Sequence, residues 1–239
     1  MASTIQVDKV QDTGGNTILS SNSTGTFTYE AASGANFTAL DADNVSAGTL
    51  AVARGGTGTT SYTAGAWNFI KSQTASGATT VDFINGTASV VLDSTYSCYM
   101  LYGTNISSDT DNRLLEIIYS TNAGSSWITS GYDQRQVANW DNAHTGNSFT
   151  DAAMTFAGSM GTAGNENSAF NFTLYNPSAT TDYMMCNFEG VNRNSSGNMY
   201  FFTGGSQYET AGDVDAIRLQ LNGAGVFSGF FKLYGLSGS

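Results

Sequence analysis

The side chains best suited to acid–base or metal chemistry are scattered along this chain and do not form a motif. The single histidine, His144, lies in the polar segment WDNAHTGNS and has no HExxH context. A general base or a zinc ligand needs partners within hydrogen-bonding or coordination distance. We therefore expect His144 to be a surface loop residue.

Two acidic segments offer the oxygen ligands that calcium prefers. Residues 109–112 (Asp-Thr-Asp-Asn) and 41–44 (Asp-Ala-Asp-Asn) combine carboxylate and amide oxygens. Neither continues into a calcium loop of about twelve residues with a central glycine and a closing glutamate. Asx turns are the expected structures, and calcium is the alternative. A glycosidase needs two carboxyl groups at a set separation, and the sequence reveals no such pair. We expect no catalytic residue, metal or cofactor.

One glycine-rich segment has some features of a phosphate-binding loop. Arg54, Gly55, Gly56 and Gly58 belong to Arg-Gly-Gly-Thr-Gly, which lacks the Gly-Lys-Ser/Thr ending of a P-loop. Ser61 stands where a dinucleotide-binding fingerprint has its third glycine. We interpret the segment as a hinge between an N-terminal segment and the main domain.

Three aromatic residues raise the question of a sugar-binding site. Trp127, Tyr132 and Trp140 lie in or beside an irregular middle region. Aromatic rings on the loops of a β-sandwich stack against sugars. The simpler interpretation, which we favour, is that these rings cap the core or fill a subunit interface. A host-glycan site at these residues is the alternative hypothesis.

The elements that position all these residues are expected to be β-strands. The chain has 239 residues, of which 40 % are hydrophobic and only 11 % are charged, with 28 glycines and 1 proline. Glycine, serine, threonine and asparagine form helices poorly, and helix surfaces normally carry Glu, Lys and Arg. The composition therefore predicts an all-β fold that is large enough to bury a core.

Charge and hydropathy exclude several partners. The net charge is −11, and the eight basic residues are scattered singly. Because nucleic acid requires a concentrated basic face, we expect no nucleic-acid partner. The N-terminus has no secretory pattern, and no window approaches the roughly 18 apolar residues of a membrane span, so we expect no membrane insertion. Cys98 and Cys186 lie in apolar segments, which favours two buried free thiols over a disulfide.

Residues 1–60 contain too few apolar side chains to fold alone. Short apolar pairs, among them Ile5 with Val7 and Ile18 with Leu19, alternate with polar turns such as DTGGN. The apolar groups must be buried against the rest of the chain, sister subunits or a larger assembly.

Residues 61–239 have the period-two alternation of strands with one buried face. Roughly ten such runs predict a jelly-roll-like antiparallel β-sandwich. The segment from RLLEIIYS to WITSGY, starting at Arg113, is expected to form a hairpin around the turn TNAGSS. Residues 133–168 and 203–213 are expected to be the longest and least regular loops.

Three segments resemble virion structural proteins of tailed bacteriophages, in particular tail-fibre-like proteins of marine phages. Residues 1–30, with the turn DTGGNT, are similar to a β-forming N-terminal segment that many of these proteins share. The segment AGTLAVARGGTGTTS, residues 47–61, is similar to a glycine element of fibre proteins. The block from FIKSQTASGATTVDFING to SGFFKLYGL resembles a β-sandwich module found at the end of such proteins.

The resemblance implies a non-enzymatic virion appendage, a short tail fibre or receptor-binding protein that is usually a homotrimer. It would assemble in the host cytoplasm, with residues 1–60 attached to other virion proteins. Ile5, Val7, Ile18 and Leu19 would be buried in that attachment, and the β-sandwich would face outward, toward a host surface glycan. The chain is short for a long tail fibre and lacks a repeat-built shaft, so a capsid decoration or head-fibre protein is the alternative. A polysaccharide depolymerase is the third hypothesis.

Overall fold

The computed structural model of the chain describes residues 9–21, 27–29, 67–140, 143–156 and 158–236. The chain divides into two units, Met1–Tyr62 and Thr63–Ser239, which we describe separately. The described residues form antiparallel β-strands and no helix. The predicted all-β fold is therefore confirmed.

The first unit contains a three-stranded antiparallel sheet. Its strands, in spatial order, are β1 (Lys9–Gln11), β2 (Thr17–Ser21) and β3 (Phe27–Tyr29). Of the residues expected to anchor the chain, Ile18 and Leu19 lie in β2, with side chains outside the described part of the chain. Ile5, Val7 and the hinge residues Arg54, Gly55, Gly56 and Gly58 lie outside the described residues. Their roles stay predictions.

The turn between β1 and β2 is built around one carboxylate. Asp12 accepts hydrogen bonds from the backbone N–H groups of Gly14 and Asn16, each at 2.8 Å, and from the Asn16 side-chain amide at 2.9 Å. These bonds, the Asn16 side-chain amide first among them, hold the Asp12 pKa below its ordinary value. Gly15 adopts φ = 80°, which glycine tolerates without a steric penalty. The segment DTGGN is therefore a side-chain-stabilised turn, as its composition predicts.

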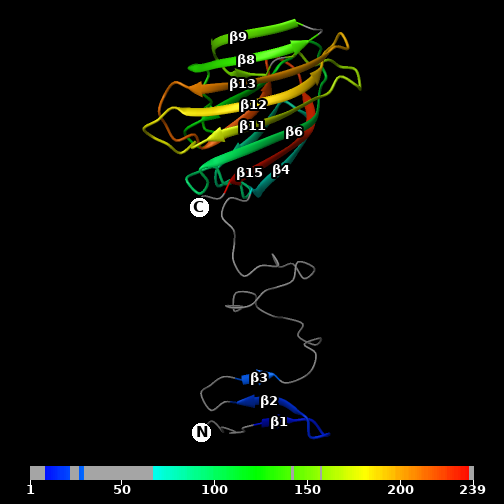
Figure 1. Ribbon diagram of the computed structural model, residues 1–239, viewed down its shortest axis with the longest axis vertical. Helices are drawn as coiled ribbons and strands as arrows, with labels where there is room; N and C mark the ends of the chain where they lie inside the picture. Colours follow the sequence, from blue (N-terminus) through cyan, green and yellow to red (C-terminus); the bar gives the residue numbers. More distant parts are fainter. Residues whose placement is uncertain (1–8, 22–26, 30–66, 141–142, 157, 237–239) are drawn as a thin grey trace. The chain divides into compact units, whose positions relative to one another are not determined.

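The second unit contains an eight-stranded antiparallel sheet, which we call the large sheet (Figure 1). Its strands, in spatial order, are β4 (Trp67–Ala78), β15 (Phe227–Leu236), β6 (Cys98–Ser108), β11 (Ser168–Tyr175), β12 (Met184–Arg193), β13 (Met199–Tyr208), β8 (Tyr132–Trp140) and β9 (Ala143–Asp151). The first and last strands of the unit, β4 and β15, are hydrogen-bonded neighbours. Pairing them ties the two ends of the unit together.

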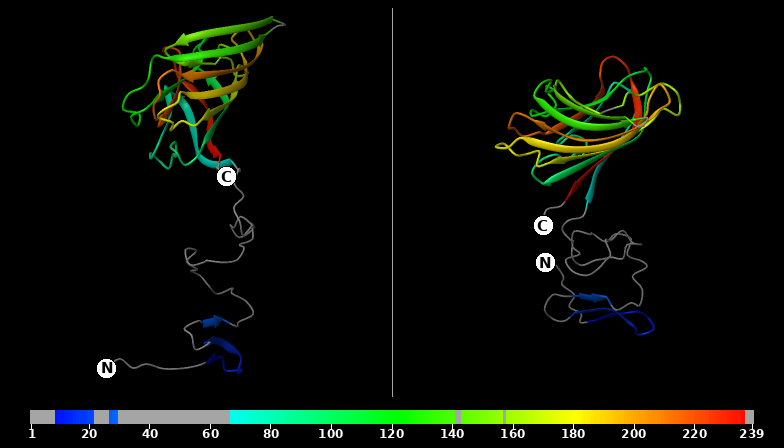
Figure 2. Two further views of the ribbon diagram at one scale, coloured as in Figure 1. Left: turned by 60° about the vertical axis from the view of Figure 1, so that its left-hand side comes forward. Right: turned by 45° about the horizontal axis from the view of Figure 1, so that its top comes forward.

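A second, four-stranded antiparallel sheet packs on one face of the large sheet. We call it the small sheet, and its strands in spatial order are β10 (Met154–Thr155), β7 (Leu115–Ser120), β14 (Ala216–Leu221) and β5 (Thr80–Ile84). Buried side chains from both sheets form one hydrophobic core, and the two layers can be followed in Figure 2. The unit is a β-sandwich; a jelly-roll-like connection of its strands stays a prediction.

Period-two alternation creates the inner face of the large sheet. In β11 the side chains of Phe170, Phe172 and Leu174 are buried, whereas the residues between them are more exposed. Glycines in adjacent strands leave the space that the rings occupy. A Cβ atom would collide with a phenylalanine ring at three such positions, namely Gly103 with Phe170, Gly190 with Phe202, and Gly204 with Phe188. Rings and glycines thus interlock across β6, β11, β12 and β13.

One phenylalanine joins the two layers. Phe156 follows β10, and its backbone N–H donates to the carbonyl of Leu115 in the small sheet at 3.0 Å. Its ring lies among three rings of the large sheet, with centroid distances of 4.6 Å to Phe170, 5.3 Å to Phe188 and 5.6 Å to Phe202. Phe156 therefore has its backbone in one layer and its side chain against the other.

The expectation of irregular loops at residues 133–168 and 203–213 is wrong for most of their length. Strands β8, β9, β10 and the start of β11 occupy much of the first range, and β13 extends to Tyr208 in the second. The pattern was missed because two of the buried positions in β8, Gln134 and Gln136, are polar. The Gln134 side-chain amide donates to the Thr155 carbonyl at 2.6 Å, and its oxygen accepts from the Thr155 N–H at 2.8 Å. Such pairing removes the penalty of burying an amide.

The predicted hairpin after Arg113 does not form. Its first half is β7, whose hydrogen-bonded neighbours are β14 and β10. Its second half is not a strand, and a single backbone bond joins the Ile128 N–H to the Tyr119 carbonyl at 2.9 Å. Both partners of β7 come from distant parts of the sequence, which a local pattern does not reveal.

The outer face of the small sheet carries a polar network. Arg218 donates from Nε and Nη2 to the two carboxylate oxygens of Asp82 at 2.7 and 2.6 Å. The Trp127 ring covers this pair, with the Arg218 guanidinium 4.1 Å from the ring centroid. A bidentate ion pair with a stacked ring leaves little apolar surface exposed there.

The two cysteines are buried free thiols, as the sequence predicts. Burial raises the pKa of Cys186 from 9.0 to about 12, with smaller opposing effects from hydrogen bonds to Tyr119 and Ser206. Burial likewise raises the pKa of Tyr99 from 10.0 to about 12. Both groups stay neutral in the folded chain under conditions that would ionise them in the unfolded chain.

We expect the free energy of unfolding to fall as the pH rises from 9 toward 12. Raised folded-state pKa values give stability that is complete below the unfolded pKa and is lost as pH rises through the folded pKa. One such group costs about 1.4 kcal/mol per pH unit within its window. Urea unfolding at successive pH values measures the slope. In Cys186→Ala the free energy of unfolding should fall less steeply with pH from pH 9 upward. A fall as steep as in the unmodified chain would contradict the contribution of the raised Cys186 pKa.

Candidate contact surface on the large sheet

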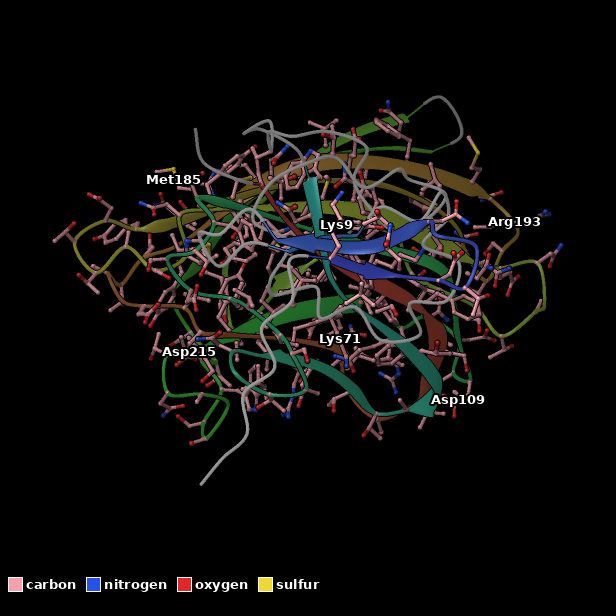
Figure 3. The ribbon with its side chains drawn as sticks, turned by 90° about the horizontal axis from the view of Figure 1, so that it is seen from below. Lys9, Lys71, Asp109, Met185, Arg193 and Asp215 are labelled. Atoms are coloured by element: carbon pink, nitrogen blue, oxygen red, sulfur yellow. The ribbon has the colours of Figure 1, made fainter. Side chains whose placement is uncertain are left out.

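The outer face of the large sheet is unusually apolar. The described residues include twelve exposed large hydrophobic side chains, and all of them except Val10 and Tyr183 lie on this face. They are Trp67, Phe69, Tyr102, Val137, Tyr175, Met185, Val191, Met199, Phe201 and Phe230. Met185 and Arg193, near the two ends of β12, are labelled in Figure 3. A sheet face with this many exposed large apolar side chains marks an interaction surface.

Strand register places opposite charges in one row across this face. Lys232 on β15 pairs with Tyr102 on β6, which pairs with Asn171 on β11, which pairs with Glu189 on β12. Residues that are directly paired in antiparallel strands project to the same face. A cation and an anion therefore stand on either side of a tyrosine and an asparagine.

Two shallow hollows adjoin this row. The first, of about 250 Å³, is lined by Tyr102, Thr104, Phe230, Lys232 and Tyr234. The second, of about 360 Å³, shares Tyr102 and Thr104 with the first and extends to Asn171, Glu189, Val191 and Phe201. The Asn171 carboxamide oxygen is buried there without a hydrogen-bond partner among the described residues. Tyr102 is thus common to both hollows.

A third hollow, of about 330 Å³, lies beside Gly205 on β13. Asp133, Arg135, Met185 and Gln207 contribute to its lining. Arg135 and Asp133 form an ion pair with each other. Because Gly205 has no side chain, the sheet surface is open at this point.

Edge-to-face ring contacts cross the opposite part of the face. The Phe69 and Tyr234 ring centroids are 5.7 Å apart, and those of Tyr234 and Tyr102 are 5.9 Å apart. Phe69 is still 58 % exposed. Trp67 and Phe69, which alternate in β4, therefore lie on the outer face of the sheet and not on the buried one.

The three aromatic residues considered for sugar binding are not brought together. Tyr132 is fully buried, and its hydroxyl oxygen accepts the Tyr119 N–H at 2.8 Å, so no sugar can stack on its ring. Burial raises the Tyr132 pKa far above its ordinary value. Trp127 is half-buried over Arg218, outside the small sheet. Trp140 ends β8, with its side chain outside the described part.

The described part of the chain does not bring together the residues considered for acid–base or metal chemistry. His144 lies in β9 rather than in the expected loop, and its side chain is not described. Asp109 accepts the Val226 N–H at 2.8 Å, and Asp111 accepts the Thr162 N–H at 2.9 Å, so both stabilise loop backbone. Among the described residues no group of His, Cys, Asp and Glu is placed to hold a metal ion. Residues 41–44 lie outside the described part.

Most residues of the contact surface were not predicted from the sequence. The available signal was a set of strands with large apolar residues at both alternating positions, such as CYMLY in β6 and SGFFKLYGL in β15. In a sandwich one such set faces the core, and the other is left exposed.

Comparison with protein-family models, curated proteins and solved structures gives no match. No helix within the described ranges is long and apolar enough to cross a membrane.

Proposed function

We propose that this protein is a non-enzymatic structural component of a tailed-bacteriophage virion, a short tail-fibre or receptor-binding appendage. The observation that carries the proposal is the apolar outer face of the large sheet. A rigid β-sandwich with one such face is suited to packing against other protein surfaces. The resemblance of residues 1–30 and 47–61 to fibre proteins supports a place in the virion.

In this proposal the two units have different tasks. Residues 1–60 attach the chain to other virion proteins and form its trimer contact, and the β-sandwich projects from the particle. Strand addition at an attachment site would bury the sparse apolar residues of the first unit. We do not propose a host-glycan contact at Trp127, Tyr132 and Trp140, because Tyr132 is buried and Arg218 stacks on Trp127.

A capsid decoration or head-fibre protein is the second candidate, because an apolar sheet face also suits packing on a shell. Imaging of intact particles that carry a label at Ser239 separates the two. Label confined to the tail vertex would support the appendage. Label distributed over the whole shell would replace the appendage with the decoration role. A particle that holds no label at all would overturn both.

Deletion of residues 1–60 is expected to leave a folded sandwich that no longer joins particles. The hydrophobic core of the second unit is formed by residues between Ala75 and Leu233, so the deletion removes none of it. The truncated chain should retain a β-sheet circular dichroism spectrum and cooperative urea unfolding, while incorporation into particles should be lost. A truncated chain incorporated at the normal level would contradict the anchoring role.

A further inference from the structure

We propose that the outer face of the large sheet binds the same face of a second copy of this chain. The twofold axis would run parallel to the strands, between β6 and β11. The contact is distinct from the trimer contact proposed for residues 1–60, and it does not depend on a virion role.

The charges on this face are complementary to themselves under the twofold operation. Lys232 and Glu189 lie in one row of the face but three strands apart, or roughly 14 Å at the usual strand spacing. Neither forms an ion pair among the described residues. The twofold operation places β15 over β12 of the second copy. Each Lys232 then faces Glu189 of the second copy, so every dimer contains two such pairs.

The shape of this face is also complementary to itself under the same operation. Tyr234 and Asn187 lie in one row, which runs through Met100 on β6 and Thr173 on β11. In that row Tyr234 pairs with Phe69 on β4, and Asn187 pairs with Gly205 on β13. The operation therefore places the exposed Phe69 ring over the hollow at Gly205 of the second copy. A protruding ring and an open glycine on one face make that face complementary to itself.

The operation also brings together one further pair of exposed apolar residues. Phe230 pairs with Thr104 on β6, and Val191 pairs with Ala169 on β11, where the register between β6 and β11 shifts. The operation therefore brings Phe230 near Val191 of the second copy. The two side chains are 50 % and 44 % exposed in the single chain. Face-to-face sheets pack about 10 Å apart with their strands within about 30° of each other, so the operation sets β15 opposite β12, β6 opposite β11 and β4 opposite β13 of the second copy.

A charge-reversal experiment with the full chain tests this arrangement. Lys232→Glu and Glu189→Lys each place like charges at both contacts, and each should raise the dimer dissociation constant by about tenfold or more. An equimolar mixture of the two variants restores opposite charges at both contacts and should associate like the unmodified chain. Sedimentation velocity measures all three. Arg193→Glu is the matched control, because it makes an equal charge change on the same face, at the end of β12 and four residues from Glu189.

Any oligomer that residues 1–60 form is the same in the unmodified chain and in every variant. The association that this oligomer produces is therefore the baseline for the comparison. Weak association of each single variant with recovery in the mixture would establish the twofold register. Absence of association of the unmodified chain above the baseline would overturn the proposal. A mixture that associates no better than the single variants would overturn it as well. Neither result would bear on incorporation into particles.

Discussion

Phe156→Ala is expected to lower the free energy of unfolding by about 3–5 kcal/mol, the usual cost of removing a buried phenylalanine ring. The ring is 3 % exposed and contacts three rings of the large sheet, while its backbone is bonded to the small sheet. The cavity would lie between two β-sheets whose backbones are held by ladder hydrogen bonds, so it would collapse little. Urea unfolding with linear extrapolation measures the change.

Phe156→Leu retains part of the volume and should cost less than the alanine variant. Phe69→Ala is the surface control, because this ring is exposed on the outer face of the single chain. At concentrations where the chain does not associate, its effect should stay within about 0.5 kcal/mol. If Phe156→Ala cost no more than Phe69→Ala under these conditions, the ring would not connect the two layers.

Gly190→Ala is expected to destabilise the sandwich by about 1–3 kcal/mol through overpacking. The added Cβ would collide with the Phe202 ring and lie 2.6 Å from the carbonyl oxygen of Ala169. A ring can shift at moderate cost, but the carbonyl belongs to the ladder between β11 and β12. Relief of the collision would therefore move one strand away from its neighbour. Thermal unfolding should record a lower midpoint.

Gly164→Ala provides the comparison for this substitution. No heavy atom lies within 4 Å of a Cβ at Gly164, and its φ is outside the left-handed region. The same chemical change should therefore leave the unfolding midpoint unchanged or raise it slightly. Equal loss at Gly164 and Gly190 would mean that the cost is not steric.

The architecture could be predicted where one face of a strand is buried and apolar. Phe170, Phe172 and Leu174 in β11 are examples, because each contributes to a visible period of two. β8 was missed, since its buried positions include Gln134, whose amide is satisfied by backbone from a strand that is distant in the sequence. The partners of β7 were missed for a related reason: sheet pairing between distant segments leaves no local pattern.

The sequence contains one sign of the contact surface, which is the presence of apolar residues at both alternating positions of a strand. This sign does not show which of the two sets faces outward. Lys232 and Glu189 are 43 residues apart in sequence (232 − 189), and only the strand order β15-β6-β11-β12 places them in one row. Two of the aromatic residues considered for sugar binding lie in different environments. Tyr132 faces the core, while Trp127 covers an ion pair.

Gln134 also closes an edge that would otherwise be open. β10 is the outermost strand of the small sheet, and such a strand presents unpaired N–H and C=O groups to any extended chain that can dock on it. The Gln134 amide occupies both backbone groups of Thr155 from the side opposite β7, as a neighbouring strand would. A side chain thus replaces a fifth strand. Nascent or damaged chains have no template there on which to start a cross-β aggregate, which matters for a protein whose described helices and strands are strands alone.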